Sequence, residues 1–279
     1  MAKGIGENMR GKSSRGLGGD RGEAESHIAR ADLFQLLALF FHLPSPELTR
    51  ALIDGSVAAD VGQILGELDF CEHSPEHSSE RESVLQLATA FEVGDLAEEQ
   101  LLRQLRAEYT RLFTHPERPV IGIYESLFLY ELQGRKGERP VLFINAAALD
   151  AERLYREAGL ARSTAFNESG DHVATQLEFA GFLLRQRAHL IMAGAAKAER
   201  AAGSEGPEQE TQNTKDMQDA QNVQDMQHNS ALCEEFWARH LSKWLLPFGE
   251  RIIAEAEHPV YRAVGELCVV AAQQGKLWD

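Results

Sequence analysis

The stretch "DLAEEQLLRQLRAEYTRLF", residues 95–113, decides the fold class of this chain. Its apolar side chains are spaced three or four residues apart and therefore share one face of an α-helix: Leu101, Leu105, Tyr109 and Leu112. Asp95 can cap the first turn of this helix, and Glu98 completes a pattern like a capping box. The stretch predicts an amphipathic helix that packs against other helices.

The same spacing recurs along most of the chain, whereas alternating runs of β-branched residues are missing. It predicts further helices at 26–43, 47–54, 57–69, 79–92, 123–134, 145–160, 171–199, 231–256 and 259–274. Pro44 and Pro46 end the first of them, and we expect Pro247 to kink or locally break the helix at 231–256. The predicted fold class is therefore all-α, a helical bundle.

Changes in composition predict how the bundle is divided. Residues 1–25 are rich in Gly, Ser and charge, which is typical of a disordered tail. We expect the polar break at 161–170 to act as a hinge between an N-terminal lobe, 26–160, and a C-terminal lobe, 171–279. Residues 203–229 contain no Leu, Ile or aromatic residue, so we predict a disordered insertion that is dispensable for folding.

The charge of the chain narrows the class of partner. Its 279 residues carry a formal net charge of -15. Affinity for a phosphate backbone comes mainly from Lys and Arg, so this balance argues against nucleic acid and favours a basic partner. We find no apolar run near the roughly 20 residues that span a bilayer. We also find no signal-peptide pattern, so we expect a cytoplasmic protein without stable membrane insertion.

The cysteines and one histidine-containing loop bear on disulfides and metals. Cys71, Cys233 and Cys268 are widely separated, which indicates no disulfide framework and suits a reducing compartment. Cys71, His73 and His77 have the spacing of three metal ligands, C-x-H-x₃-H. Because no fourth ligand is evident, we assign neither a metal nor another cofactor.

Catalytic patterns are weak. Ser126 lies in "YESLF", which lacks the small flanking residues of a nucleophile elbow. Asp171 and His172 are neighbours in sequence, and adjacent side chains on a helix diverge by about 100°. They therefore cannot form the hydrogen bond between the base and its orienting carboxylate in a triad. Their simplest interpretation is that Asp171 is a helix N-cap and His172 a solvated first-turn residue. We predict that the protein is not an enzyme.

Four segments, in the right order, resemble the motifs of the TorD/DmsD (NarJ-related) chaperones. "EYTRLF" (108–113), a proline-containing loop and "YESLF" (124–128) resemble the first motif, and "ESGDHVATQLEFAGFLL" (168–184) resembles the E-x-P-D-H motif. "FWARHLSKWLLPF" (236–248) is similar to a third segment, and "HPVYRAVGELCVVA" to the last helix. Ser169 and Gly170 replace the proline-containing pair of the family, so we expect a less rigid turn before Asp171.

The resemblance implies a TorD-like, all-helical, cytoplasmic chaperone of redox-enzyme maturation, either a monomer or a homodimer. Such proteins bind the twin-arginine signal peptide, or the apo-catalytic subunit, of a molybdopterin-dependent reductase. They hold it until its cofactor is inserted and prevent premature export. One alternative is a NarJ-like assembly chaperone for a subunit that is not exported, and a less favoured one is a small helical hydrolase or nucleotide-binding enzyme.

The expected ligand, a peptide with a basic start and an apolar stretch, needs carboxylates beside a hydrophobic groove. The predicted carboxylates are Glu125, Glu168, Asp171 and Glu178. The predicted apolar lining is Tyr124, Phe128, Trp237 and Trp244, and the predicted polar residues are Ser126, His172 and His240. We expect this surface to form around the break at 161–170.

Overall fold

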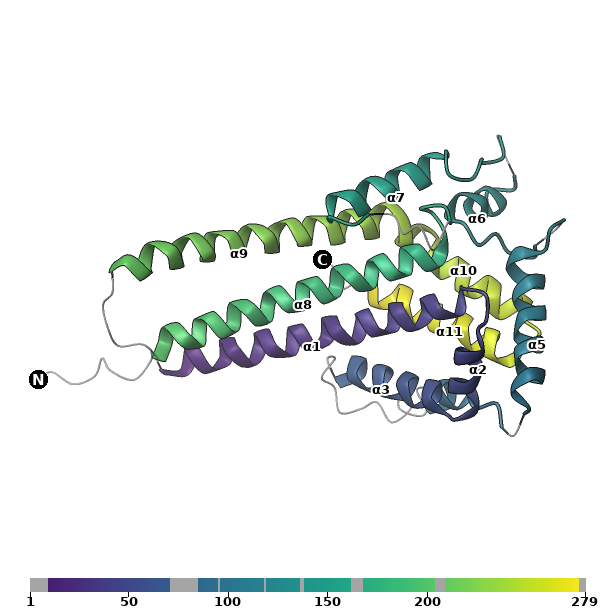
Figure 1. Ribbon diagram of the computed structural model, residues 1–279, viewed down its shortest axis with the longest axis horizontal. Helices are drawn as coiled ribbons and strands as arrows, with labels where there is room; N and C mark the ends of the chain where they lie inside the picture. Colours follow the sequence, from purple (N-terminus) through teal and green to yellow (C-terminus); the bar gives the residue numbers. More distant parts are fainter. Residues whose placement is uncertain are drawn as a thin grey trace, which may run out of the picture.

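The computed structural model describes residues 10–70, 85–94, 96–117, 119–135, 138–161, 168–203 and 209–275. Three long helices run along the molecule: α1 (Arg10–Phe40), α8 (Val173–Gly203) and α9 (Gln209–Phe236) (Figure 1). The shorter helices are α2 (Pro46–Ile53), α3 (Ser56–Phe70), α5 (Glu98–Tyr109), α6 (Glu125–Leu132), α7 (Ala146–Glu157), α10 (Ser242–Glu255) and α11 (Pro259–Gln274). The described residues contain no strand beyond one isolated bridge, so the all-α prediction is confirmed.

The core forms around two helix pairs, α1 with α8 and α10 with α11 (Figure 1). Helix α1 also packs on α3 and α11. One continuous core contains Phe34 of α1, Phe41 directly after α1, Leu177 of α8 and Phe248 of α10. The first helix of the chain is therefore part of the same bundle as the last four. This packing differs from the predicted division into two lobes on either side of 161–170.

Two glycines set the close approach of α10 and α11. A Cβ at Gly249 would lie 2.8 Å from the Cβ of Cys268 and 2.8 Å from the carbonyl oxygen of Gly265. Real Cβ atoms do not approach neighbours this closely without a shift of the backbone, so any larger residue at Gly249 would separate the two helices. The contact therefore sets the distance between α10 and α11.

Both segments that we predicted to be disordered are largely helical where the structure describes them. Helix α1 begins at Arg10, and Ala24 is fully buried. Helix α9 takes in residues 209–229, and the Asn229 side chain donates hydrogen bonds to the Leu183 carbonyl and to Gln186 Oε1, both at 3.1 Å. Residues 1–9 and 204–208 lie outside the described residues. The predicted disordered segments, 1–25 and 203–229, are therefore too long. Helices α1 and α9 extend into them because packing against α8 stabilises helical structure in the polar residues next to the apolar ones.

The predicted helix at 95–113 exists as α5 and a π-helical turn, η1 (Thr110–Thr114). Its N-cap is Ala97 without a side-chain hydrogen bond, while Asp95 lies outside the described residues. In the π-helical turn the carbonyls of Arg111 and Leu112 accept hydrogen bonds from the N–H groups of residues 120 and 121, at 3.3 Å and 2.8 Å. The turn therefore ties the proline-containing loop back onto α5.

Glu108 at the start of "EYTRLF" joins α5 to the turn between α10 and α11. Its Oε1 accepts hydrogen bonds from the backbone N–H groups of Glu257, at 2.6 Å, and His258, at 3.2 Å. Arg111 donates to both of its oxygens, at 2.8 Å and 2.9 Å. Burial alone would raise the pKa of this carboxyl, but the hydrogen bonds from Arg111 and the two N–H groups outweigh it and lower the pKa.

Pro247 lies inside α10, which runs without interruption from Ser242 to Glu255. The irregular turn is instead the π-helical segment η2 (Trp237–Leu241), which precedes α10. None of the helices in the described part of the chain is long and apolar enough to cross a membrane.

Candidate peptide-binding groove

The segments "YESLF" and "SGDH", 45 residues apart in sequence, meet as two short antiparallel stretches. Tyr124 and His172 form an isolated bridge, in which Glu125 N–H donates to the Asp171 carbonyl at 2.9 Å and Val173 N–H donates to the Ile123 carbonyl at 3.1 Å. This pairing places the start of α6 beside the start of α8. The two motifs therefore lie side by side in space, although neither forms a strand.

Asp171 caps α6, not its own helix. Its Oδ2 accepts hydrogen bonds from the Ser126 N–H at 3.2 Å and the Ser126 hydroxyl at 2.5 Å. The residue before α8 is His172, whose Nδ1 accepts from the Ala174 N–H at 3.2 Å. The prediction that Asp171 caps the helix at 171–199 is therefore wrong: the acidic side chain satisfies free N–H groups of a distant helix.

His172 is not a solvated first-turn residue, since only 3% of it is exposed. Burial, together with the nearby charge of His42, lowers the pKa of His172 to about 3. Its ring packs edge-on against Tyr124, with the ring centroids 5.2 Å apart. The neutral imidazole thus acts as a helix cap inside the protein.

Three other predicted site residues form a buried polar network with Gln176. The indole N–H of Trp244 donates to Gln176 Oε1 at 3.0 Å, and Gln176 Nε2 donates to Glu125 Oε2 at 2.6 Å. His240 Nδ1 lies 2.7 Å from the same carboxylate oxygen, and its Nε2 lies 3.3 Å from Asp150. All four members of this network are at most 2% exposed. The network joins α6, α8 and α10, so Glu125, His240 and Trp244 are used within the fold.

The groove itself lies next to this network, between α7 and α8, with a volume of about 620 Å³. Its apolar wall consists of Tyr155, Leu160, Phe179 and Phe182. Tyr155 and Phe179 pack edge to face with centroids 4.6 Å apart, and the Tyr155 hydroxyl donates to the Gly170 carbonyl at 2.7 Å. Ring packing on Phe179 and a hydrogen bond to Gly170 therefore fix the position of Tyr155.

Three carboxylates border the groove: Glu152, Glu168 and Glu178. Within the described part of the lining these carboxylates outnumber the basic residue Arg156, and Glu178 Oε1 also lies 3.0 Å from His42 Nε2. The Tyr124 hydroxyl donates to Glu168 Oε2 at 2.6 Å, which orients that carboxylate. Burial and this hydrogen bond raise the pKa of Tyr124, so its proton stays available to Glu168.

Two small residues shape the lip of the groove. A Cβ at Gly170 would lie 2.7 Å from Glu152 Cγ and 2.8 Å from the Ala148 carbonyl, so only glycine allows this approach to α7. The Ser169 carbonyl accepts from the His172 N–H at 2.9 Å, and its hydroxyl accepts from the Phe143 N–H at 3.2 Å. The turn that we expected to be less rigid is held by these bonds in place of the proline.

Thr175 adds a hydrogen-bonding group to the groove lining. Its hydroxyl is buried and has no hydrogen-bond partner among the described residues. An unpaired buried hydroxyl is unfavourable unless something bonds to it.

The structure brings only part of the predicted site to this groove. Glu168 and Glu178 line it, and Tyr124 reaches it through Glu168. Phe128 packs on Trp244 and Phe248 in the core, and Trp237 lies over the last turn of α11 near Gly275. The predicted residues therefore fall into three groups: some border the groove, some form the buried hydrogen bonds between helices, and some pack in the core.

Sequence reasoning missed the α7 side of the groove, Glu152 and Tyr155, and the α8 pair Phe179 and Phe182. Each pair is spaced three residues apart, which places both members on one helical face. That spacing was the available signal. It could not show that the two faces oppose each other.

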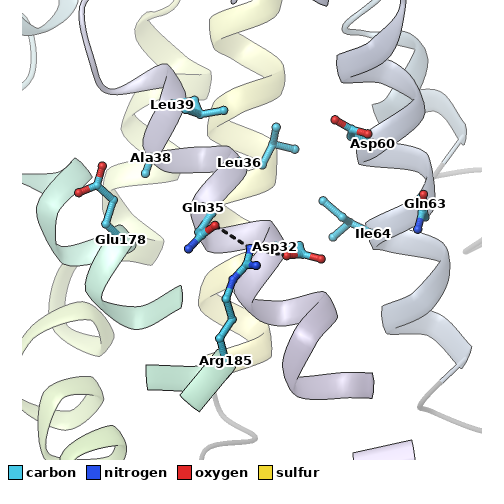
Figure 2. Close-up of a pocket in the computed structure, with 10 residues that line it drawn as sticks. All are labelled: Asp32, Gln35, Leu36, Ala38, Leu39, Asp60, Gln63, Ile64, Glu178 and Arg185. Atoms are coloured by element: carbon cyan, nitrogen blue, oxygen red, sulfur yellow. Dashed lines mark hydrogen bonds and ion pairs between the residues drawn. The ribbon is translucent and has the colours of Figure 1, made fainter. Parts of the chain in front are cut away.

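A second hollow, of about 660 Å³, lies between α1, α3 and α8 (Figure 2). Arg185 donates to Asp32 Oδ1 and to Gln35 Oε1 there, each at 2.6 Å. Glu178 borders this hollow as well as the groove, so it stands on the ridge between them. The lining of the second hollow has aliphatic but no aromatic side chains, unlike the groove.

The possible metal ligands Cys71, His73 and His77 lie outside the described residues. Within the described residues, no group of three or more His, Cys, Asp or Glu is placed to hold a metal ion.

Comparison with known families points to one of them. Residues 74–206 match the family described as nitrate reductase delta subunit. This is a family of assembly chaperones for molybdoenzymes and not of enzymes, in agreement with the predicted class of protein. A comparison with curated proteins gave no match. The matched range includes every described residue that lines the groove, whereas the second hollow draws eight of its ten lining residues from α1 and α3, outside that range.

Proposed function

We propose that this protein is a cytoplasmic maturation chaperone of a molybdopterin-dependent oxidoreductase, and that it receives the twin-arginine signal peptide of the catalytic subunit in the α7–α8 groove. The observation that carries the proposal is the composition of the groove, an aromatic wall bordered by an excess of carboxylates. A twin-arginine signal has a basic start followed by an apolar stretch. The two parts match the two kinds of surface that the groove offers.

Two kinds of interaction would recognise the peptide: carboxylates would bind its arginines, and aromatic side chains would cover its apolar part. Glu168 lies shortly before α8, and Glu178 lies on α8. Guanidinium groups pair with such carboxylates through charge-assisted hydrogen bonds. Tyr155, Phe179 and Phe182 remove apolar peptide surface from water, at about 25 cal/mol per Å². Bound in this way, the signal is withheld from export while the cofactor is inserted.

The test is titration of the protein with the twin-arginine signal peptide of a molybdopterin-dependent reductase from the same organism. The double variant Glu168→Gln/Glu178→Gln removes two charges from the groove. We expect its affinity to fall about ten-fold at low salt, equivalent to about 1.4 kcal/mol. Glu234→Gln/Glu250→Gln makes the same change in net charge at exposed sites outside the groove and should bind like the wild type. Equal affinities of the two double variants would refute groove recognition.

A second candidate function is favoured by the name of the matching family. A nitrate reductase delta subunit matches residues 74–206, which supports a NarJ-like chaperone that binds a reductase subunit that is not exported. Pull-down with the full-length catalytic subunit and with a signal-deleted form separates the two functions. Capture of both forms equally supports the second candidate, whereas capture of the full-length form alone supports the first.

A further inference from the structure

Helix α7 forms one wall of the groove, and few apolar side chains hold it to the rest of the bundle. Its buried residues are Ala148, Ala151 and Leu154, so two of the three contribute only a methyl group. The helix lies at the outer edge of the molecule, beside the end of α9 (Figure 1). Elements with few buried apolar contacts open locally at low free energy, and the lids of binding sites are drawn from such elements.

Charged side chains attach α7 to the segment where α9 continues into η2. Asp150 Oδ2 accepts a hydrogen bond from Arg239 Nε at 2.7 Å, and His240 Nε2 lies 3.3 Å from the same oxygen. On the next turn of α7, Arg153 donates to Glu235 Oε1 at 2.5 Å. Burial alone would raise the pKa of the Asp150 carboxyl, but hydrogen bonds from Arg239 and Arg153 outweigh it and lower the pKa. These five residues form a latch between α7 and the bundle, called the α7 latch below.

The π-helical turn η2 directs two neighbouring residues onto one carboxylate oxygen. Arg239 and His240 are adjacent in sequence, and adjacent side chains on an α-helix diverge by about 100°. In a π-helical turn, with its i→i+5 hydrogen bonds, more residues complete one turn and neighbours diverge less; such turns are frequent at functional sites. His240 Nδ1 lies 2.7 Å from Glu125 Oε2, so the α7 latch continues into the buried polar network that joins α6, α8 and α10.

We propose that α7 is a lid on the α7–α8 groove and that the α7 latch sets how often this lid opens. In the latched state Tyr155 of α7 packs against Phe179 of α8, as described above. Opening breaks the contact of Asp150 with η2 and the contact of Arg153 with α9, and it separates the two aromatic side chains. A ligand of the groove enters and leaves through the open state.

The consequence for the client rests on the proposed function. Since entry and exit both require α7 to open, a weaker latch raises the association and dissociation rate constants of the signal peptide together. The Kd then changes less than either rate constant, because the latch acts on the opening step and not on the contacts with the peptide. Loss of a groove contact, in contrast, acts mainly on the dissociation rate constant.

The first test is hydrogen–deuterium exchange of the full chain without ligand. Asp150→Asn removes the charge at the centre of the latch, and we expect the amides of α7 to exchange about five-fold faster or more. Glu157→Gln is the matched control, because it removes one charge from the same helix but Glu157 pairs with Arg153 of α7 itself. Its α7 exchange should match the wild type, and the amides of 177–184 in α8 should be unchanged in both variants. Equal α7 exchange in Asp150→Asn and the wild type would overturn the inference.

The second test removes the latch from the opposite side. The Arg239 side chain is 52% exposed, so the fold should tolerate Arg239→Gln. We expect this variant to speed α7 exchange about as much as Asp150→Asn does. The double variant should add little to either single change, because both remove the same contact. Fully additive effects would show that the two residues act separately, and the latch would then be rejected.

Stopped-flow fluorescence with the labelled signal peptide separates the lid from the proposed function. We expect Asp150→Asn to raise both rate constants about three-fold or more, while the Kd changes less than about two-fold. If α7 exchange responds as expected but the peptide does not bind the wild type, the proposed function fails and the latch stands. If the peptide binds and both rate constants are the same in the variant and the wild type, α7 does not gate the groove and the lid is rejected, whereas the proposed function stands.

Discussion

The buried imidazole of His172 should make the stability of this protein depend on pH in a defined range. Burial, followed by the charge of His42, lowers the pKa of His172 from 6.5 to about 3. As the pH falls through 6.5 the unfolded chain takes up a proton, while the folded protein remains neutral until about pH 3. The stability that depends on neutral His172 is therefore complete above pH 6.5 and is lost progressively between pH 6.5 and about pH 3.

The size of the effect follows from the window. Each pH unit is worth about 1.4 kcal/mol, so at about pH 5, roughly 1.5 units below the ordinary value, the loss is about 2 kcal/mol. That figure is insensitive to the folded-state pKa as long as it lies below pH 5. It is a large fraction of the roughly 5–15 kcal/mol that stabilises a typical domain.

The assay is urea unfolding at about pH 7.5 and about pH 5, for the wild type and for His172→Asn. Asparagine can still accept the Ala174 N–H as an N-cap but takes up no proton. His27 and His258 also have lowered pKa values through burial, and their contributions cancel because both proteins contain them. The wild type should lose about 2 kcal/mol more than the variant between the two pH values.

His228→Asn, at an exposed position, controls for the removal of a histidine as such. If the wild type and His172→Asn lose the same free energy of unfolding between the two pH values, the imidazole is not the buried neutral cap described above. A greater loss in His172→Asn would contradict the reasoning in the same way.

Two further predictions concern the support of the bundle. Glu108→Gln removes the charge that receives Arg111 and two backbone N–H groups, and should lower the free energy of unfolding by about 1–3 kcal/mol in urea titration, whereas the exposed Glu99→Gln should leave it unchanged. Gly249→Ala should destabilise by about 1–3 kcal/mol, because its Cβ would overlap α11, as seen in thermal unfolding. Gly66→Ala, in a helix with open space around it, should instead stabilise by up to about 1 kcal/mol, and a stabilised Gly249→Ala would contradict the tight contact between α10 and α11.

The helices were predictable because their signal is local. Spacings of three and four placed α2, α3 and α11 within one residue of their ends. The polar ends of α1 and α9 were missed because their apolar content is low, although Ala24 and Asn229 pack on the bundle. The composition of a segment indicates how much apolar surface it can bury. It does not show whether another helix lies close enough to pack against that segment.

The site was predictable only in part, because its contacts are not local. "YESLF" and "SGDH" were identified as belonging together, but Asp171 turned out to cap a helix that begins 46 residues earlier. Glu125, His240 and Trp244 were predicted at a surface and are buried, since each finds its polar partner on a different helix. The spacing of residues along one helix shows which side chains share a face, and the opposing face has to come from the structure.

The pairing of α1 with α8 also bears on how the chain is made. Helix α1 ends at Phe40, whereas α8 begins at Val173, so the ribosome adds 132 residues between them. At about 5–20 residues per second, translation takes roughly 7–26 s to cross that interval. During this time Leu33, Phe34 and Leu37 emerge without the helix that later covers them. A nascent chain with an uncovered apolar helix is itself a substrate for general chaperones, so the yield of this protein should depend on their supply.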